Sequence, residues 1–164
     1  MLASAELRPG QDCQAMATAR DLGQPIENIH GDTLGVVGNL GDSICYAGVR
    51  EKVEAVQGAL SRRIVDQGLP NRLIDPMYTV GVSDGMRNGT PEMRFSLTGR
   101  EVTADSVSLH LEGSGVEGVI AIVACDKPPV GTLSAILERN VPSIVMSDGS
   151  IKPGHDPETE EEID

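Results

Sequence analysis

Residues Val116–Ala124 read VEGVIAIVA, a nearly continuous apolar run that decides the fold class. A strand with one face in water alternates apolar and polar residues, whereas a strand buried on both faces is apolar along most of its length. Strands of the second kind are typical of parallel sheets that carry helices on both faces. The stretch therefore predicts a central strand of an α/β domain.

Three further segments predict strands of the same sheet. They are short apolar runs bounded by glycine or proline, as is typical of buried strands: Thr33–Asn39, Met77–Val82 and Val141–Ser147. Because helical patterns lie between the runs, the strands are expected to be parallel. The predicted fold is a three-layer α/β domain, with a mostly parallel sheet and helices on both faces.

The intervening helices are predicted from spacing and end signals. Apolar residues recur at steps of three and four over Val49–Ile64, which indicates one buried helix face. Thr98–Glu101 has the composition of a capping box, so a helix is expected over Glu101–Glu112. A shorter helix is expected over Gly131–Asn140.

The chain has 164 residues, which is about the size of one domain. Residues 1–31 are weakly patterned, with at most a short helix around Cys13–Arg20. Residues 32–155 carry the α/β pattern. Residues 156–164 form an acidic tail, which is expected to be mobile because its composition is polar.

Charge and cysteine content exclude several classes of function. The formal net charge is −12 and the sequence has no basic cluster, so we expect no nucleic-acid partner. No apolar run approaches the ~20 residues of a membrane span. The start of the chain does not resemble a secretory signal, and three widely spaced cysteines favour a reducing compartment. We therefore expect a cytoplasmic protein without a membrane partner.

Titratable side chains follow each predicted strand. Ligands of open parallel sheets bind at the carboxyl ends of the strands. A cysteine beside a strand can instead be a small buried hydrophobe, an Asp-Gly pair can be a turn, and a lysine before two prolines can be solvated. The residues concerned are Cys45, Asp84, Cys125, Asp126, Lys127 and Asp148.

Three segments give these residues a more specific interpretation. Gly81–Ser106 begins GVSDGMRNGTPEMRFSL, Cys125–Leu133 reads CDKPPVGTL, and Ser147–His155 reads SDGSIKPGH. In order and spacing they resemble the dihydroxy-acid dehydratase family, and the resemblance extends over about residues 33–155. Members of this family remove water from a 2,3-dihydroxy carboxylate to give a 2-keto acid. The resemblance implies a hydro-lyase that acts on a small dihydroxy acid.

The resemblance also implies two cofactors. Cys45 and Cys125 would be two of three thiolates that hold an iron–sulfur cluster, with [2Fe–2S] favoured over [4Fe–4S]. Asp84, Asp126 and a carbamylated Lys127 would surround a Mg²⁺ ion. Soft thiolates suit the cluster and hard oxygens suit Mg²⁺. The family's first cysteine lies in a Pro-Cys-Asn context, whereas Tyr46 follows Cys45 here.

Other parts of the family's site have no counterpart in this chain. The third cysteine, a further glutamate and the serine base are expected beyond residue 164, so no catalytic base is assigned. The partner is then either a missing carboxy-terminal portion or a second copy in a homodimer. Within the family, the GSIKPG ending resembles the enzymes of branched-chain amino-acid biosynthesis more than the phosphogluconate dehydratases. The alternatives are a sugar-acid dehydratase of the same family and a truncated, inactive α/β module that binds a metal or a partner chain.

Overall fold

The fold is built on a sheet of four parallel strands. The computed structural model describes residues 16–69, 72–149 and 153–163. The strands lie in the order β2-β1-β3-β4, so that β1 and β3 are central. Their bounds are β1 (Asp32–Leu40), β2 (Arg72–Val80), β3 (Val116–Val123) and β4 (Ser143–Ser147).

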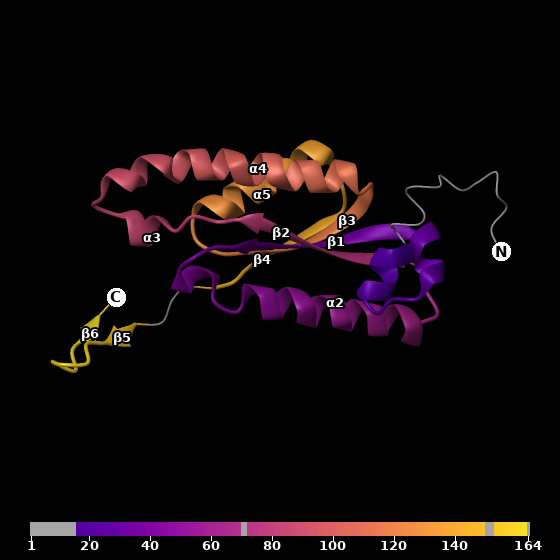
Figure 1. The fold of residues 1–164 in the computed structure, drawn as a ribbon, viewed down its shortest axis with the longest axis horizontal. Coiled ribbons are helices and arrows are strands. Elements are labelled where there is room, and N and C mark those ends of the chain that lie inside the picture. The colour runs from indigo at the N-terminus through magenta and orange to yellow at the C-terminus, as the bar shows by residue number, and fades with distance from the viewer. Residues whose placement is uncertain (1–15, 70–71, 150–152, 164) are drawn as a thin grey trace.

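Helices cover both faces of this sheet. Helix α2 (Val49–Asp66) lies on one face, and α4 (Ser96–Gly113) and α5 (Lys127–Arg139) lie on the other (Figure 1). Each face of the sheet has its own hydrophobic core. Because side chains alternate along a strand, neighbouring residues of β1 contribute to different cores: Val36 packs on the α2 side and Val37 on the α4 and α5 side. The predicted three-layer α/β architecture is confirmed.

Three element starts differ from the predictions by four residues or more, and proline explains two of them. Strand β2 begins at Arg72 rather than Met77 and runs through Pro76. It is an edge strand paired with β1, where a missing N–H is tolerated. Helix α5 begins at Lys127 rather than Gly131, because prolines fit the first turn of a helix. Helix α4 begins at Ser96, so the predicted capping box at Thr98 is wrong.

The segment before β1 is attached to the edge of the sheet. Residues 16–21 are helical, while the first part of the helix predicted around Cys13–Arg20 lies outside the described residues. The 3-10 turn η1 (Ile26–His30) follows. The Gln24 side chain accepts a hydrogen bond from the Ile74 N–H at 2.8 Å and donates one to the Ile74 carbonyl at 2.6 Å. These bonds pair the segment with β2.

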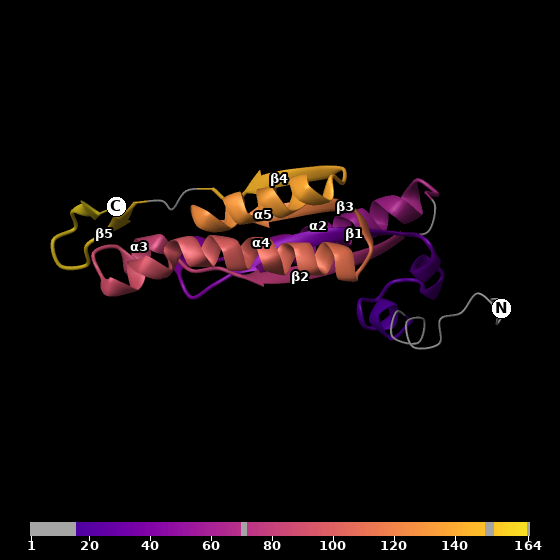
Figure 2. The same ribbon diagram turned by 90° about the horizontal axis from the view of Figure 1, so that it is seen from above.

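The polar tail contains a small ribbon that its composition does not predict. Strands β5 (Gly154–His155) and β6 (Glu162–Ile163) pair antiparallel. The ribbon lies at the end of the molecule opposite the N-terminal segment (Figure 2). Along the described parts of the chain, no helix is both long and apolar enough to cross a membrane.

Candidate functional site

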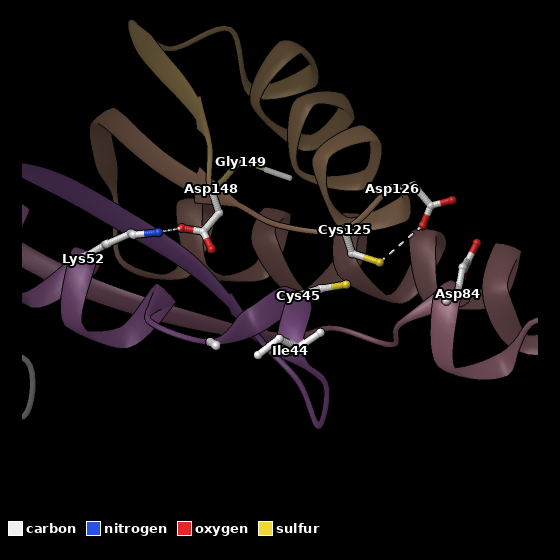
Figure 3. A pocket seen from close by; sticks show the side chains of 10 residues that line it. Ile44, Cys45, Lys52, Asp84, Cys125, Asp126, Asp148 and Gly149 are labelled. Carbon is white, nitrogen blue, oxygen red and sulfur yellow. Dashed lines mark hydrogen bonds and ion pairs between the residues drawn. The ribbon is translucent and has the colours of Figure 1, made fainter. Parts of the chain in front are cut away.

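A cavity of about 600 Å³ opens at the carboxyl ends of the strands. The connections that follow β1, β2, β3 and β4 all contribute to its wall, as expected for a parallel sheet. Figure 3 shows the side chains from these connections turned toward one another. The lining residues are Ile44, Cys45, Ala47, Lys52, Asp84, Gly85, Cys125, Asp126, Asp148 and Gly149.

The two predicted cysteines lie together in this cavity, and we call them the thiol pair. Cys45 comes from the 3-10 turn η2 (Ile44–Tyr46), and Cys125 follows the end of β3. Ser83 Oγ lies between them, 3.6 Å from Cys45 Sγ and 3.9 Å from Cys125 Sγ. Both thiols are free of disulfides. The side chains approach from opposite sides and their sulfurs face the same space (Figure 3).

The backbone at Cys125 has an unusual conformation. Its φ angle is 64°, in the left-handed region that residues other than glycine seldom adopt. Such conformations cost free energy and are concentrated at functional sites, where the surrounding structure holds them. The strain marks Cys125 as a residue whose side-chain direction is fixed by its surroundings.

Burial raises the pKa of the Cys125 thiol above its ordinary value. The backbone N–H groups of Asp84 and Asp126 act in the opposite direction but do not cancel the effect. The neutral thiol is therefore favoured over the thiolate in the chain alone. A bound cation reverses this preference, because a coordinating thiol is deprotonated.

The Tyr46 ring packs beneath the thiol pair. The residue is 5% exposed and belongs to the core between β1 and α2. Gly41 and Gly81 lie so close to the ring that a Cβ atom at either position would be 2.4–2.5 Å from it. The Tyr46 hydroxyl is buried and has no hydrogen-bond partner. Burial, and after it the nearby Cys125 thiol, raises the pKa of this phenol.

The predicted Mg²⁺ residues form a second group, which we call the charge cluster: Asp84, Asp126 and Lys127. Lys127 Nζ donates to Asp84 Oδ2 at 2.5 Å and to Asp126 Oδ2 at 2.7 Å. Asp84 lies at the start of the short helix α3 (Asp84–Arg87) and is 8% exposed. Ser96 Oγ donates to the same Asp84 oxygen at 2.7 Å. The other oxygen, Asp84 Oδ1, is buried without a partner.

The side chains of Lys127 and Asp126 favour each other's charged forms. Burial alone would raise the pKa of Asp126, but hydrogen bonds, first of all from Lys127, lower it below the ordinary value. The hydrogen bonds to Asp126 and Asp84 raise the pKa of Lys127. The ammonium group of Lys127 therefore acts as the counterion of two carboxylates.

The thiol pair and the charge cluster are adjacent. Cys125 Sγ lies 3.4 Å from Asp126 Oδ1, which Figure 3 marks with a dashed line. On the other side of the thiols, Lys52 from α2 forms an ion pair with Asp148, which follows β4. The Asp148 N–H donates to the Val123 carbonyl at 2.8 Å and so ties this loop to the end of β3.

The donor atoms fit two different cations, each incompletely. Within the described part of the chain, no three His, Cys, Asp or Glu side chains gather as a complete set of metal ligands. Two thiols suit a soft metal or an iron–sulfur cluster, and two carboxylates suit a hard cation such as Mg²⁺. The unpartnered Asp84 Oδ1 is an acceptor that a cation would satisfy. Both cations require further ligands from elsewhere.

The structure thus brings together all five residues predicted as ligands, with Asp148 beside them, while their roles as ligands stay a prediction. Sequence reasoning missed Tyr46 and Lys52. Tyr46 could have been noticed because the chain has only three aromatic residues and glycines recur near it and after β2. Lys52 gave no signal, because a lysine on an amphipathic helix is ordinarily solvated.

The sequence matches a known family over most of its length. The family is described as "Dihydroxy-acid/6-phosphogluconate dehydratase N-terminal", and its model matches residues 48–164. The chain belongs to this family. The matched range includes Asp84, Cys125, Asp126 and Lys127, and Cys45 lies just before it.

Several relatives carry the name dihydroxy-acid dehydratase. The protein of Nitrosospira multiformis is 48% identical over 112 residues, which cover 68% of this chain and 19% of that protein. The protein of Nitrosomonas eutropha is 49% identical over 77 residues, or 47% of this chain and 14% of the relative. That of Rippkaea orientalis is 47% identical over 77 residues, with the same coverage. The aligned part of the chain thus spans less than a fifth of these relatives.

Proposed function

We propose that the chain is the amino-terminal part of a dihydroxy-acid dehydratase. The reaction is the elimination of water from a 2,3-dihydroxy carboxylate to give a 2-keto acid, in branched-chain amino-acid biosynthesis. One observation carries the proposal: a thiol pair and a carboxylate–lysine cluster adjoin in one cavity at the carboxyl end of the sheet. The names of the relatives support the same reaction.

In this proposal the two groups of side chains hold two cofactors. Cys45 and Cys125 hold an iron–sulfur cluster, with [2Fe–2S] favoured, while Asp84, Asp126 and Lys127 hold Mg²⁺. When bound, these groups supply Lewis acidity toward the hydroxyl and carboxylate oxygens of the substrate. The chain's own residues fix the ligand directions: the strained backbone at Cys125 and the Ser96 hydrogen bond to Asp84 hold one ligand of each group.

Lys127 must change its charge before it can bind a cation. Its ammonium group now lies between the two carboxylates and repels any second cation. Carbamylation removes this repulsion. The ammonium group first loses a proton to solvent, and the neutral amine then attacks CO₂, so that the N–C bond forms while one C=O π bond opens and its electron pair moves to oxygen. The nitrogen then loses a second proton to solvent. The product is an anionic carbamate with two oxygens, so one positive charge is replaced by one negative charge.

The charges of the cavity favour an unphosphorylated acid. The family also includes 6-phosphogluconate dehydratases by its description. The described cavity wall presents Asp84, Asp126 and Asp148 against the ammonium group of Lys52. A dianionic phosphate has no basic cluster to bind there, whereas Lys52 can orient a single carboxylate. A sugar acid without phosphate remains the alternative substrate, and a cytoplasmic homodimer is the proposed setting.

The test joins this chain to the remaining carboxy-terminal part of the Nitrosospira multiformis enzyme. We expect anaerobically purified chimera to be brown and to convert 2,3-dihydroxyisovalerate to its 2-keto acid, whereas the chain alone is inactive because the base and a third thiolate are missing. Cys125→Ser in the chimera is the matched control and should remove both colour and activity. A folded chimera that stays colourless after cluster reconstitution would contradict the proposal.

A further inference from the structure

The two edge strands of the sheet are protected to different degrees. An exposed sheet edge is a template for pairing with another strand, and native proteins blunt such edges with proline, charged side chains or a covering segment. Strand β2 has all three: Pro76, Arg72 and the Gln24 side chain, which is hydrogen-bonded to Ile74. Strand β4 reads SIVMS, without proline or charge, and no described strand lies on its outer side. The edge at β4 is therefore open to extension by another strand.

Strand β4 has the sequence of an interior strand and the exposure of an edge strand. Met146 pairs with Ile122 of the core under α2, whereas Val145 pairs with Ala121 of the core under α4 and α5. Apolar side chains therefore lie on both faces of the strand, which is typical of the interior of a parallel sheet. All five residues of β4 are nevertheless exposed.

Helix α5 continues this apolar surface beside β4, which it contacts (Figure 2). Gly131 faces α4, because a Cβ there would lie 2.5 Å from the Arg100 carbonyl oxygen. Leu133 is about 200° further around the helix and so faces away from α4. The exposed apolar residues of α5 and β4 together form what we call the edge surface: Val130, Leu133, Leu137, Ile144, Val145 and Met146. Contiguous exposed apolar surfaces of this kind mark interaction sites.

The edge surface leads into the cavity of the thiol pair and the charge cluster. Helix α5 begins directly after Asp126, β4 ends directly before Asp148, and both aspartates line the cavity. A strand added parallel to β4 would end at the same rim. A polypeptide seated on the edge surface is therefore placed to supply the ligands that both proposed cations still require.

The rest of a dehydratase polypeptide is the occupant that fits this surface. The aligned part of the chain covers 19% of the Nitrosospira multiformis protein, so most of such an enzyme lies outside the fold described above. The ribbon of β5 and β6 does not cover the surface, because it lies beyond the end of the sheet (Figure 2). A second copy fits less well, because each chain has a formal net charge of −12 and two copies repel each other.

We propose that the carboxy-terminal portion of the dehydratase docks on the edge surface and adds a parallel strand to β4. The inference rests on the proposed function, since it takes the missing portion of that enzyme as the partner. Docking covers the outer stripe of α5 and brings the end of the added strand to the cavity beside Asp148.

Hydrogen exchange measured by mass spectrometry compares the chain alone with the chimera described above. The Asp148 N–H donates to the Val123 carbonyl, and backbone direction alternates along a strand, so the Val145 N–H points away from β3. We expect the peptide that covers Ser143–Ser147 to exchange at least about tenfold more slowly in the chimera, because an added strand protects these amides. The peptide that covers Arg72–Val80, at the protected edge, should change by less than about twofold.

Two leucine substitutions locate the docked portion. Leu137 in the edge surface and Leu109 on α4 are 68% and 73% exposed, so the chain alone should tolerate glutamate at either position. In the chimera, Leu137→Glu should speed exchange of β4 by about tenfold or more, because docking would bury an unpaired charge. Leu109→Glu should leave the exchange of β4 within about twofold of the parent chimera. Equal effects of the two substitutions would overturn the placement on α5 and β4.

The remaining outcomes separate this inference from the proposed function. An active chimera in which β4 exchanges as fast as in the chain alone overturns the inference and leaves the proposed function standing. A chimera with a protected β4 but without cluster colour or activity does the reverse. Protection of β4 in the chain alone that rises with chain concentration would assign the surface to a second copy, which overturns the inference. If the chimera does not fold, the intact Nitrosospira multiformis enzyme takes its place, and rapid exchange in its counterpart of β4 would overturn the inference.

Discussion

The thiol pair and the charge cluster adjoin at the end of β3, but their polar atoms are satisfied to different degrees. In the charge cluster, Lys127 neutralises two carboxylates at 2.5 and 2.7 Å, and Ser96 adds a bond at 2.7 Å. Around the thiols, the contacts with Ser83 are 3.6 and 3.9 Å, and the Tyr46 hydroxyl has no partner. One group holds its own counterion, and the other does not.

The proposed soft metal and the proposed Mg²⁺ would therefore meet different competition for their ligands. A soft metal can bind the thiols by displacing protons, because no cation already lies between them. A hard cation at Asp84 and Asp126 must first compete with the covalently attached ammonium group of Lys127. The chain alone should therefore bind a soft metal readily and Mg²⁺ poorly.

The largest expected effect comes from exchanging one ligand in each group. Cys125→Ser should abolish Cd²⁺ binding, a greater loss than the roughly 10–100-fold that follows loss of an outer-shell partner. Asp126→Asn should leave Cd²⁺ binding nearly intact, because the amide keeps the shape of the side chain and thiolate ligation does not use it. Charge-transfer absorbance measures both variants, and circular dichroism confirms folding. If both variants fold and lose Cd²⁺ binding to the same extent, the thiol pair and the charge cluster form one site.

A second experiment tests the counterion in the charge cluster. Bicarbonate at constant pH should strengthen Mg²⁺ binding by about tenfold or more, because carbamylation replaces a positive by a negative charge close to the cation. Isothermal titration of the chain with Mg²⁺ measures the change. Lys127→Arg keeps the positive charge and cannot form the carbamate, so its Mg²⁺ binding should not respond to bicarbonate. A bicarbonate response that survives in Lys127→Arg would contradict this account of Lys127.

Two buried serines provide a matched pair for stability. Ser96→Ala removes a short bond to the Asp84 carboxylate and should cost about 2 kcal/mol in free energy of unfolding, the range for hydrogen bonds to charged groups. Ser83→Ala removes long contacts with the sulfurs and with the Met86 N–H at 3.5 Å, so about 1 kcal/mol or less is expected. Urea unfolding measures the free energy of unfolding of both variants and so ranks the two losses. The reverse order would show that the thiol surroundings are the better satisfied group.

The position of the site could be predicted from sequence because the fold class fixes it. The apolar run before Cys125 indicated a buried parallel strand, and parallel strands end at one edge, where Asp84, Cys125 and Asp126 then meet. The start of β2 was predicted too late, because a proline such as Pro76 usually indicates the boundary of a strand. Whether a strand accepts a proline in its interior depends on whether it lies at the edge of the sheet, which the sequence does not show.

The balance of charges within the site could not be predicted in this way. That Lys127 bridges Asp84 and Asp126 depends on distances between side chains of two connections. The same applies to Tyr46, since its burial requires Gly41 and Gly81 to lie against the ring after folding. Periodicity indicates which face of an element is buried, but not which polar atoms find partners there.

The smallest expected effect concerns Asp75, a half-buried carboxylate on β2 that has no lysine partner among the described residues. Burial raises the pKa of Asp75, and the Ser114 hydroxyl and His110 oppose this without cancelling it. The folded state then binds a proton more readily than the unfolded state, so the ionised carboxylate lowers stability above the folded-state pKa. Asp75→Asn should therefore raise the urea midpoint slightly at pH 7, and the gain should shrink as the pH falls toward the unfolded-state pKa of about 3.9. Asp105→Asn, at an exposed position of α4, is the control for removal of one negative charge. If the gain at Asp75 persisted unchanged at acid pH, it would have to come from packing, and the contrast between carboxylates with and without a lysine counterion would lose its electrostatic basis.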